Sequence, residues 1–139
     1  MFKSSSQLMW TAPPGWIHKE SITLLHPEGV ANVIFSSEPV SQEIDSESYA
    51  SMQGDLLWKE FPGYGELDFE SFVLAGVGSG FKRTFSWVPP DGIPVTQFQI
   101  YAVRDGRGYT ATATAPSSQF YTMDQILLHA LTNLAVRTI

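Results

Sequence analysis

The sequence predicts an α+β domain in which an antiparallel β-sheet is covered by helices. Three observations carry this prediction. Residues 81–115 contain alternating segments separated by two turn sequences, Pro89-Pro90-Asp91-Gly92 and Asp105-Gly106. A helical pattern over 45–61 comes before them, and a second helical stripe over 122–134 comes after them. Strands, one helix, a run of antiparallel strands and a final helix, in this order, are typical of an α+β fold.

The N-terminal part of the chain is expected to be extended. Residues 7–12 are a candidate short strand that ends at Pro13-Pro14-Gly15, and residues 16–25 are a candidate strand or extended arm. Residues 30–37 alternate more clearly, which places Val33 and Phe35 on one face and Ile34 on the other. We therefore expect this segment to be the first well-formed strand.

The first helix is predicted to begin at Asp45 or Ser46, because short polar side chains satisfy the free backbone N–H groups at a helix start. Pro62-Gly63 ends it near residue 61. Gly54 falls in its middle, where glycine costs about 1 kcal/mol relative to alanine, and a close contact at the backbone would explain it. The apolar side chains at helical spacing are Tyr49, Met52, Leu56 and Leu57.

A further strand is predicted over residues 67–77, followed by the glycine-rich segment Gly76-Val77-Gly78-Ser79-Gly80. Part of a dinucleotide-binding fingerprint has this appearance, but that motif must open a helix. Residues 81–87 alternate as a strand instead, so we interpret the glycines as a hairpin or bulge.

A two-residue turn at Asp105-Gly106 sets the pairing of the strands on either side of it. One face of this pair is apolar, with the pairs Phe98–Ala113, Ile100–Ala111 and Ala102–Tyr109. The other face is polar, with the pairs Gln97–Thr114, Gln99–Thr112 and Tyr101–Thr110.

A turn at Pro89-Pro90-Asp91-Gly92 extends this division to the preceding strand. Arg83 then falls on the apolar face, and we interpret it as a residue at the sheet margin with its stem buried and its charged head in water. Under this pairing Phe81, Phe85 and Trp87 join the apolar face, and Lys82, Thr84 and Ser86 join the polar face.

The last helix is predicted from a capping box, in which Gln125 follows Thr122 by three residues. Its apolar stripe needs a partner surface, and the alanine-rich face of the preceding strands allows a helix to approach closely. The stripe consists of Met123, Ile126, Leu127, Ala130, Leu131 and Leu134.

Composition and charge exclude several classes of function. Hydrophobic residues make up 43% of the chain, which is enough for a sizeable core. Cysteine is absent, so thiol nucleophiles, zinc–thiolate sites and disulfides are excluded. The net charge of −6 disfavours nucleic-acid binding, because phosphate backbones are negative. The N-terminus leads into no apolar run, and no segment approaches the roughly 20 apolar residues of a membrane span. We therefore expect one cytoplasmic domain over 1–139, without stable membrane insertion.

The candidates for catalytic or metal chemistry are few. His18 and His26 could form a metal site only with a third ligand, and no acidic residue stands at a spacing typical of one. His129 is expected at the surface of the last helix. Glu66, Asp68 and Glu70 alternate along one strand, which would place all three carboxylates on one face. Such a row is more often a charged edge that prevents strands of other molecules from pairing. We expect no catalytic residue, no metal and no cofactor. If the protein were an enzyme, these three carboxylates would be the candidate active site.

Four short strings carry a resemblance to a known superfamily. They are Pro14-Gly15-Trp16, Ala31-Asn32-Val33-Ile34, Glu60-Phe61-Pro62-Gly63-Tyr64 and Gly106-Arg107-Gly108-Tyr109-Thr110-Ala111-Thr112. With the order of elements, they resemble the superfamily that joins photosystem PsbP proteins, the yeast Ran-binding Mog protein, bacterial DcrB-type proteins and mycobacterial LpqN-type lipoproteins. The likeness spans nearly the whole chain, and none of the strings is catalytic.

This resemblance implies a PsbP/Mog-like αβα sandwich with a non-enzymatic, protein-binding role. DcrB-like cytoplasmic members act as chaperones for membrane-inserting segments of secretion effectors. The absence of a lipobox cysteine sets this chain apart from the lipoprotein branch and favours a cytoplasmic relative.

The polar sheet face is the predicted site for a protein partner, because neutral side chains can donate and accept hydrogen bonds without the desolvation cost of charges. Its expected members are Lys82, Thr84, Gln97, Gln99, Tyr101, Thr110, Thr112 and Thr114. The same face could also be only the solvent side of a sheet. The function expected is an adaptor or chaperone for a secreted or membrane-inserting partner, acting as a monomer or homodimer.

The alternative is a carrier of a small apolar ligand, held between helix and sheet in a cavity lined by Phe81, Phe85 and Phe98. Exposed tryptophans would add anchors for a protein partner, although at least two of the four are expected in the core. These tryptophans are Trp10, Trp16, Trp58 and Trp87.

Overall fold

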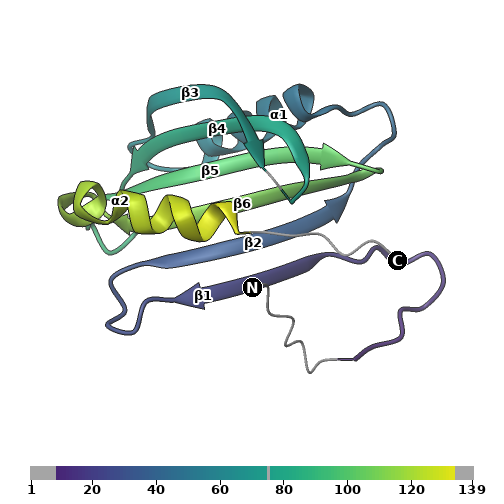
Figure 1. Ribbon diagram of the computed structural model, residues 1–139, viewed down its shortest axis with the longest axis horizontal. Helices are drawn as coiled ribbons and strands as arrows, with labels where there is room; N and C mark the ends of the chain where they lie inside the picture. Colours follow the sequence, from purple (N-terminus) through teal and green to yellow (C-terminus); the bar gives the residue numbers. More distant parts are fainter. Residues whose placement is uncertain (1–8, 75, 134–139) are drawn as a thin grey trace.

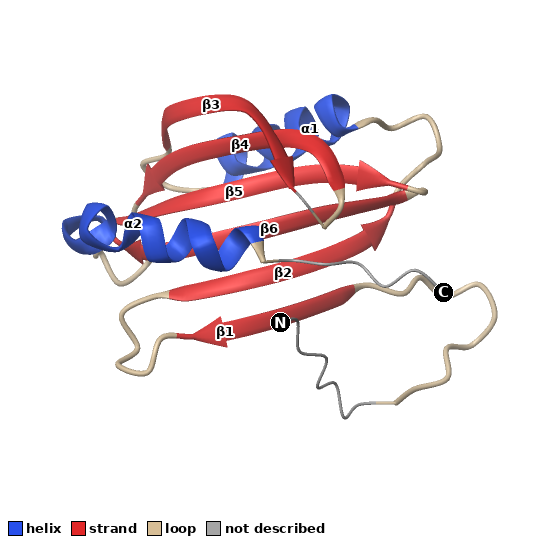
Figure 2. Ribbon diagram, in the orientation of Figure 1, coloured by secondary structure: helices blue, strands red, loops and turns tan. Residues whose placement is uncertain are grey.

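The computed structural model describes residues 9–74 and 76–133. Six strands form one antiparallel sheet in the order β1-β2-β6-β5-β4-β3, and Figures 1 and 2 show α1 behind this sheet and α2 in front of it. This arrangement confirms the predicted α+β fold with helices on an antiparallel sheet. The elements are β1 (Glu20–Leu25), β2 (Asn32–Pro39), α1 (Ser46–Glu60), β3 (Gly65–Leu74), β4 (Gly78–Trp87), β5 (Val95–Arg104), β6 (Arg107–Pro116) and α2 (Ser117–Thr132).

The first two predicted N-terminal segments differ from the observed strands. Residues 9–12 form no strand, and residues 7 and 8 of the predicted first strand lie outside the described residues. Strand β1 begins at Glu20 and pairs with β2. On its other side β2 pairs with β6, which places Val33 opposite Ala113 and Ile34 opposite Thr112. The predicted division of Val33 and Ile34 between the two faces is therefore confirmed.

Helix α1 has the predicted start and end. The Asp45 side chain accepts a hydrogen bond from the backbone N–H of Ser48 at 2.8 Å, which satisfies one of the free donors of the first turn. This bond also holds the pKa of the Asp45 carboxyl below its usual value. The helix ends at Glu60, and the backbone N–H of Phe61 closes it on the carbonyl of Leu57.

The hairpin between β5 and β6 has the predicted turn and register. Asp105 and Gly106 have φ angles of 51° and 76°, the left-handed values that a two-residue hairpin turn requires. Phe98 pairs with Ala113 and Gln99 with Thr112, as the turn position predicted.

Helix α2 packs on β5, β6 and β2 and closes the larger core. Ala111 and Ala113 are completely buried beneath Leu127 and Leu131, which confirms the predicted alanine-lined docking surface. The helix begins at Ser117, before the predicted Thr122. Phe120 explains the difference, because its ring is buried against Phe98 at a centroid distance of 4.7 Å and draws the first turn into the core. Of the predicted stripe, Ile126 is exposed and Leu134 lies outside the described residues.

The register between β4 and β5 differs from the prediction by one residue. Lys82 pairs with Ile100 and Arg83 pairs with Gln99, because the connection over 88–94 is longer than a tight turn at Pro89-Pro90-Asp91-Gly92. A shift of one residue moves every side chain of a strand to the other face. Phe81, Arg83, Phe85 and Trp87 therefore lie on the face that α1 covers, and Lys82, Thr84 and Ser86 lie on the face that α2 covers.

Candidate functional site

The sheet face beneath α1, here called the α1-side face, is half covered. Helix α1 packs on β4 and β5, where Tyr49 and Ala50 meet the completely buried Tyr101. At the end of the helix the ring of Phe61 lies 4.0 Å from that of Trp87. In the part of the chain that the structure describes, no helix lies over β1 and β2 on this face.

Arg83 is the centre of a polar network under α1. Its Nε donates to a carboxylate oxygen of Glu66 at 2.8 Å, and its Nη1 donates to the hydroxyl of Tyr101 at 2.9 Å and to the carbonyl of Ala50 at 3.2 Å. Only 6% of the residue is exposed. The prediction of a marginal arginine with its head in water is wrong, because the register places Arg83 under the helix.

The surroundings of Arg83 also shift the ionisation of its partners. Burial raises the pKa of the Tyr101 hydroxyl far above its usual value, and Arg83 opposes this rise only in part. Burial lowers the pKa of Arg83 itself, but Tyr101 and Glu66 outweigh that effect and raise it overall. The pair is therefore a neutral phenol beside a permanent guanidinium.

Gly54 is the position on α1 that makes room for this guanidinium. A Cβ atom built on Gly54 would lie 2.6 Å from Nη2 of Arg83 and 2.9 Å from Cζ. This close approach explains why a glycine stands in the middle of the helix, a position for which the sequence alone offered no reason.

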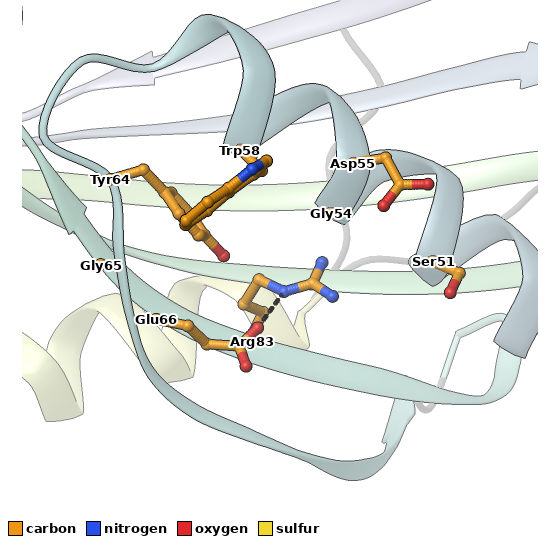
Figure 3. Close-up of a pocket in the computed structure, with 8 residues that line it drawn as sticks. All are labelled: Ser51, Gly54, Asp55, Trp58, Tyr64, Gly65, Glu66 and Arg83. Atoms are coloured by element: carbon orange, nitrogen blue, oxygen red, sulfur yellow. Dashed lines mark hydrogen bonds and ion pairs between the residues drawn. The ribbon is translucent and has the colours of Figure 1, made fainter.

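A cleft of about 370 Å³ opens between α1 and the start of β3. Figure 3 shows Trp58 and Asp55 above the cleft, Tyr64 at one end, and Arg83 with its guanidinium below the helix, joined to Glu66. Trp58 is 72% exposed and meets Tyr64 edge to face, with ring centroids 6.2 Å apart. The lining residues are Ser51, Gly54, Asp55, Trp58, Tyr64, Gly65, Glu66 and Arg83.

The three carboxylates of β3 do not share one face. A bulge between Glu66 and Asp68 turns Glu66 to the α1-side face, while Asp68 and Glu70 stay on the other face. Glu70 lies 3.4 Å from the ammonium of Lys82. The predicted row is therefore broken, and no histidine lines the cleft that Glu66 enters. Among residues 9–74 and 76–133, no group of three or more acidic or histidine side chains is arranged to hold a metal ion.

The open half of the α1-side face carries a grid of neutral side chains. Gln97 donates to the Thr114 hydroxyl at 2.6 Å, and Gln99 donates to the Thr112 hydroxyl at 3.2 Å. Cross-strand pairing continues both rows into β2 and β1, and we call the whole surface the neutral patch. Its members are Thr23, Leu25, Asn32, Ile34, Gln97, Gln99, Thr112 and Thr114.

Hydrogen bonds tie the neutral patch to the structure under α1. The indole of Trp87 donates to Gln97 at 2.7 Å, and the hydroxyl of Tyr101 donates to the side-chain oxygen of Gln99. Both glutamines are therefore held in one orientation, with Gln97 buried and Gln99 half-buried.

The eight residues predicted to form one partner-binding surface do not do so. Lys82 and Thr84 lie on the α2 side, and Lys82 is placed over the ring of Phe98 at 4.6 Å. Tyr101 and Thr110 are buried on the α1 side, with the hydroxyl of Thr110 3.3 Å from that of Tyr49. Gln97, Gln99, Thr112 and Thr114 remain as members of the neutral patch.

The residues predicted to line a cavity for an apolar ligand do not lie on one face of the sheet. Phe81 and Phe85 lie on the α1-side face, while Phe98 lies on the other face against α2. The cleft between α1 and the sheet is open and lined by charged side chains, so it does not fit an apolar ligand. Of the four tryptophans none is buried, and Trp10, Trp16 and Trp58 are exposed, so the expectation of at least two core tryptophans is wrong.

Sequence comparisons do not place the chain in a family: no protein-family model matches it, and no curated protein matches its sequence. None of the helices within the described ranges has the length and apolar character needed to cross a membrane.

Solved structures share its fold. PA94 of Pseudomonas aeruginosa, a protein of unknown function described as a candidate regulator, has a TM-score of 0.71 at 17% identity, covering 92% of this chain and 90% of its own. LpqN of Mycobacterium tuberculosis, involved in cell envelope biogenesis, has a TM-score of 0.54 at 15% identity, covering 88% of this chain and 84% of its own. The PsbP protein of the cyanobacterium Synechocystis has a TM-score of 0.53 at 8% identity, covering 88% of this chain and 94% of its own.

These similarities confirm that the chain has a PsbP/LpqN-like fold, as the short sequence strings indicated. None of the three descriptions names an enzymatic activity. At such identities the likeness establishes the fold alone.

Proposed function

We propose that this protein is a non-catalytic binding domain that holds an apolar helical segment of a secreted or membrane-inserting protein against the neutral patch. One observation carries the proposal: the patch bears no charged side chain, although the chain has a net charge of −6. Leu25 is 74% exposed within it, and Ile34 is half-buried.

The chemistry of the patch suits such a partner. An apolar helix that carries a few polar groups needs both aliphatic contact and hydrogen bonds when it leaves water, and neutral amides and hydroxyls supply these bonds without the desolvation cost of ions. Gln97 and Gln99 each use one N–H of the side-chain amide on a threonine, which leaves a second N–H for a ligand. Their fixed orientation reduces the entropy lost on binding.

The surface that contacts the partner can be identified by photo-crosslinking in cells that express the native partner. A benzoylphenylalanine in place of Leu25 is expected to crosslink to an apolar helical segment, which mass spectrometry of the crosslinked peptide identifies. The same residue in place of Tyr121, which is 66% exposed on α2, is the control and is expected to yield no such product. Crosslinks from Tyr121 alone, or to polar surfaces only, would contradict the proposal.

A charge placed in the patch tests the same surface thermodynamically. Thr112→Lys is expected to weaken capture of the crosslinked partner by at least about tenfold, because a buried unpaired ammonium is strongly disfavoured. Thr122→Lys adds the same charge on the exposed side of α2 and is expected to leave capture unchanged. Equal capture by both variants, with unchanged circular dichroism, would reject the patch as the binding surface.

A further inference from the structure

The cleft between α1 and β3 lies apart from the neutral patch. The patch is built on β1, β2, β6 and β5, whereas the cleft is lined by α1, the start of β3 and Arg83 of β4. Because α1 packs on β4 and β5, the two surfaces lie on opposite flanks of this helix. An inference about the cleft therefore does not rest on the function proposed for the patch.

The charges of the cleft favour a cationic ligand. Its charged lining residues are Asp55, Glu66 and Arg83, two negative and one positive. Arg83 is already paired with Glu66 at 2.8 Å, and Asp55 forms no ion pair with any residue that the structure describes. A ligand with one positive charge would balance the site at two charges of each sign, whereas an anion would raise the imbalance to three against one.

The aromatic residues suit the same ligand. Trp58 follows Asp55 by three residues on α1, so both side chains lie on one side of the helix. The exposed indole of Trp58 and the edge-on ring of Tyr64 form a corner above the Arg83–Glu66 pair, as Figure 3 shows. A guanidinium or ammonium can lie on the indole face while it donates to the Asp55 carboxylate.

Arg83 adds a hydrogen-bond donor for a ligand oxygen. Its Nη2 has no acceptor within hydrogen-bond distance among the described residues, and this atom is not sealed in the interior but faces the open cleft. A guanidinium N–H that faces a cleft can donate a charge-assisted hydrogen bond to a ligand oxygen, which is stronger than a bond between neutral groups. A main-chain carbonyl oxygen can accept this bond without adding a negative charge.

We propose that the cleft binds an arginine or lysine residue within a segment of a partner polypeptide. The cationic head of this residue lies on Trp58 and pairs with Asp55 and Glu66, while a main-chain carbonyl of the segment accepts from Nη2 of Arg83. Glu66 and Arg83 are held in place by their mutual ion pair and by Tyr101, so the site is formed before the ligand arrives.

The proposal can be tested with small probes and the full chain. The probe is N-acetyl-arginine methylamide, and binding is followed by the indole N–H resonance of Trp58, assigned by its absence in Trp58→Phe. A saturable shift is expected, with about tenfold weaker binding of the uncharged N-acetyl-citrulline methylamide. Butylguanidine has the cation but lacks the carbonyl, and its binding is expected to be several-fold weaker than that of the arginine probe. Equal binding of the citrulline probe overturns the cation site, and equal binding of butylguanidine overturns the role of Arg83.

A matched pair of variants locates the site. Asp55→Asn is expected to weaken binding of the arginine probe by about fivefold to tenfold, and Asp124→Asn, which removes the same charge on α2, is expected to leave it unchanged. Asp55 is exposed, so its replacement leaves the fold intact, which the amide spectrum of the variant verifies. Equal effects of the two variants would assign the binding to general charge and overturn the proposal.

Discussion

Gly54 of α1 lies directly over the guanidinium of Arg83, at a distance that leaves no room for a side chain: a Cβ atom would stand 2.6 Å from Nη2. Three hydrogen bonds, to Glu66, Tyr101 and Ala50, hold the guanidinium at that place. Helix, sheet and the polar network beneath them therefore meet at one contact.

Gly54→Ala is expected to lower the free energy of unfolding by about 1–2 kcal/mol, although alanine by itself favours the helix by about 1 kcal/mol. The reason is that the guanidinium must move and lose part of its bonding. In the background of Arg83→Met the same change is expected to be neutral or stabilising by up to about 1 kcal/mol. Urea denaturation of the four proteins in this double-mutant cycle measures the coupling. Stabilisation by Gly54→Ala alone would show that Arg83 relaxes freely.

Arg83→Met is expected to destabilise the domain by roughly 2–4 kcal/mol, because it removes a buried guanidinium that makes three hydrogen bonds and leaves Tyr101 without its donor. The neighbouring Lys82→Met is the control. Lys82 pairs with the half-exposed Glu70, so its loss is expected to cost about 1 kcal/mol or less. The difference in urea midpoint separates the loss of three hydrogen bonds from the loss of one ion pair, and equal effects would contradict the central position of Arg83.

Phe98→Ala and Leu131→Ala are each expected to lower the free energy of unfolding by about 3 kcal/mol, because both side chains belong to the core under α2. Ile126→Ala, on the same helix and 68% exposed, is expected to cost less than about 1 kcal/mol. Thermal and urea unfolding of the three variants measure these values. A near-neutral Phe98→Ala would mean that the assignment of the α2 face is wrong.

Tyr49 makes the free energy of unfolding depend on pH in the alkaline range. Burial raises the pKa of its hydroxyl from 10.0 to about 12. The folded state therefore keeps this proton where the unfolded state has lost it, so the stabilisation is complete below pH 10 and is lost as pH rises through about 12. Tyr49→Phe is expected to reduce the slope of unfolding free energy against pH in this window. An unchanged slope would assign the alkaline loss of stability to other groups.

The two hairpins show how far local sequence determines a sheet. Asp105-Gly106 is a turn of defined length, so the pairing of Phe98 with Ala113 follows from it directly. The connection over 88–94 contains several prolines and a turn closed by Gly92 on the carbonyl of Pro89, and its length is not evident from its residues. Alternation in β4 could not resolve the register, because neighbouring side chains on opposite faces of the strand, such as Arg83 and Thr84, are both buried.

Helix α2 and strand β3 differ from their predictions for related reasons. Thr122 has the residue type of an N-cap, but the burial of Phe120 against Phe98 extends the helix back to Ser117. Alternation places Glu66, Asp68 and Glu70 on one face, but the bulge after Glu66 breaks the alternation. A bulge has no residue signature of its own at this position.

The sequence by itself determined the order and type of the elements after residue 16, the start of α1 at Asp45, the pairing of β5 with β6 and the alanine-lined surface for α2. These features depend on turn chemistry, capping and hydrophobic period, which act over a few residues. Only the tertiary structure decided that Arg83 lies under Gly54, that Lys82 lies on the opposite face, and that Glu66 joins Trp58 and Asp55 at one cleft. These relationships depend on a one-residue register and a bulge, which are set by the packing of α1 and α2 on the two faces of the same sheet.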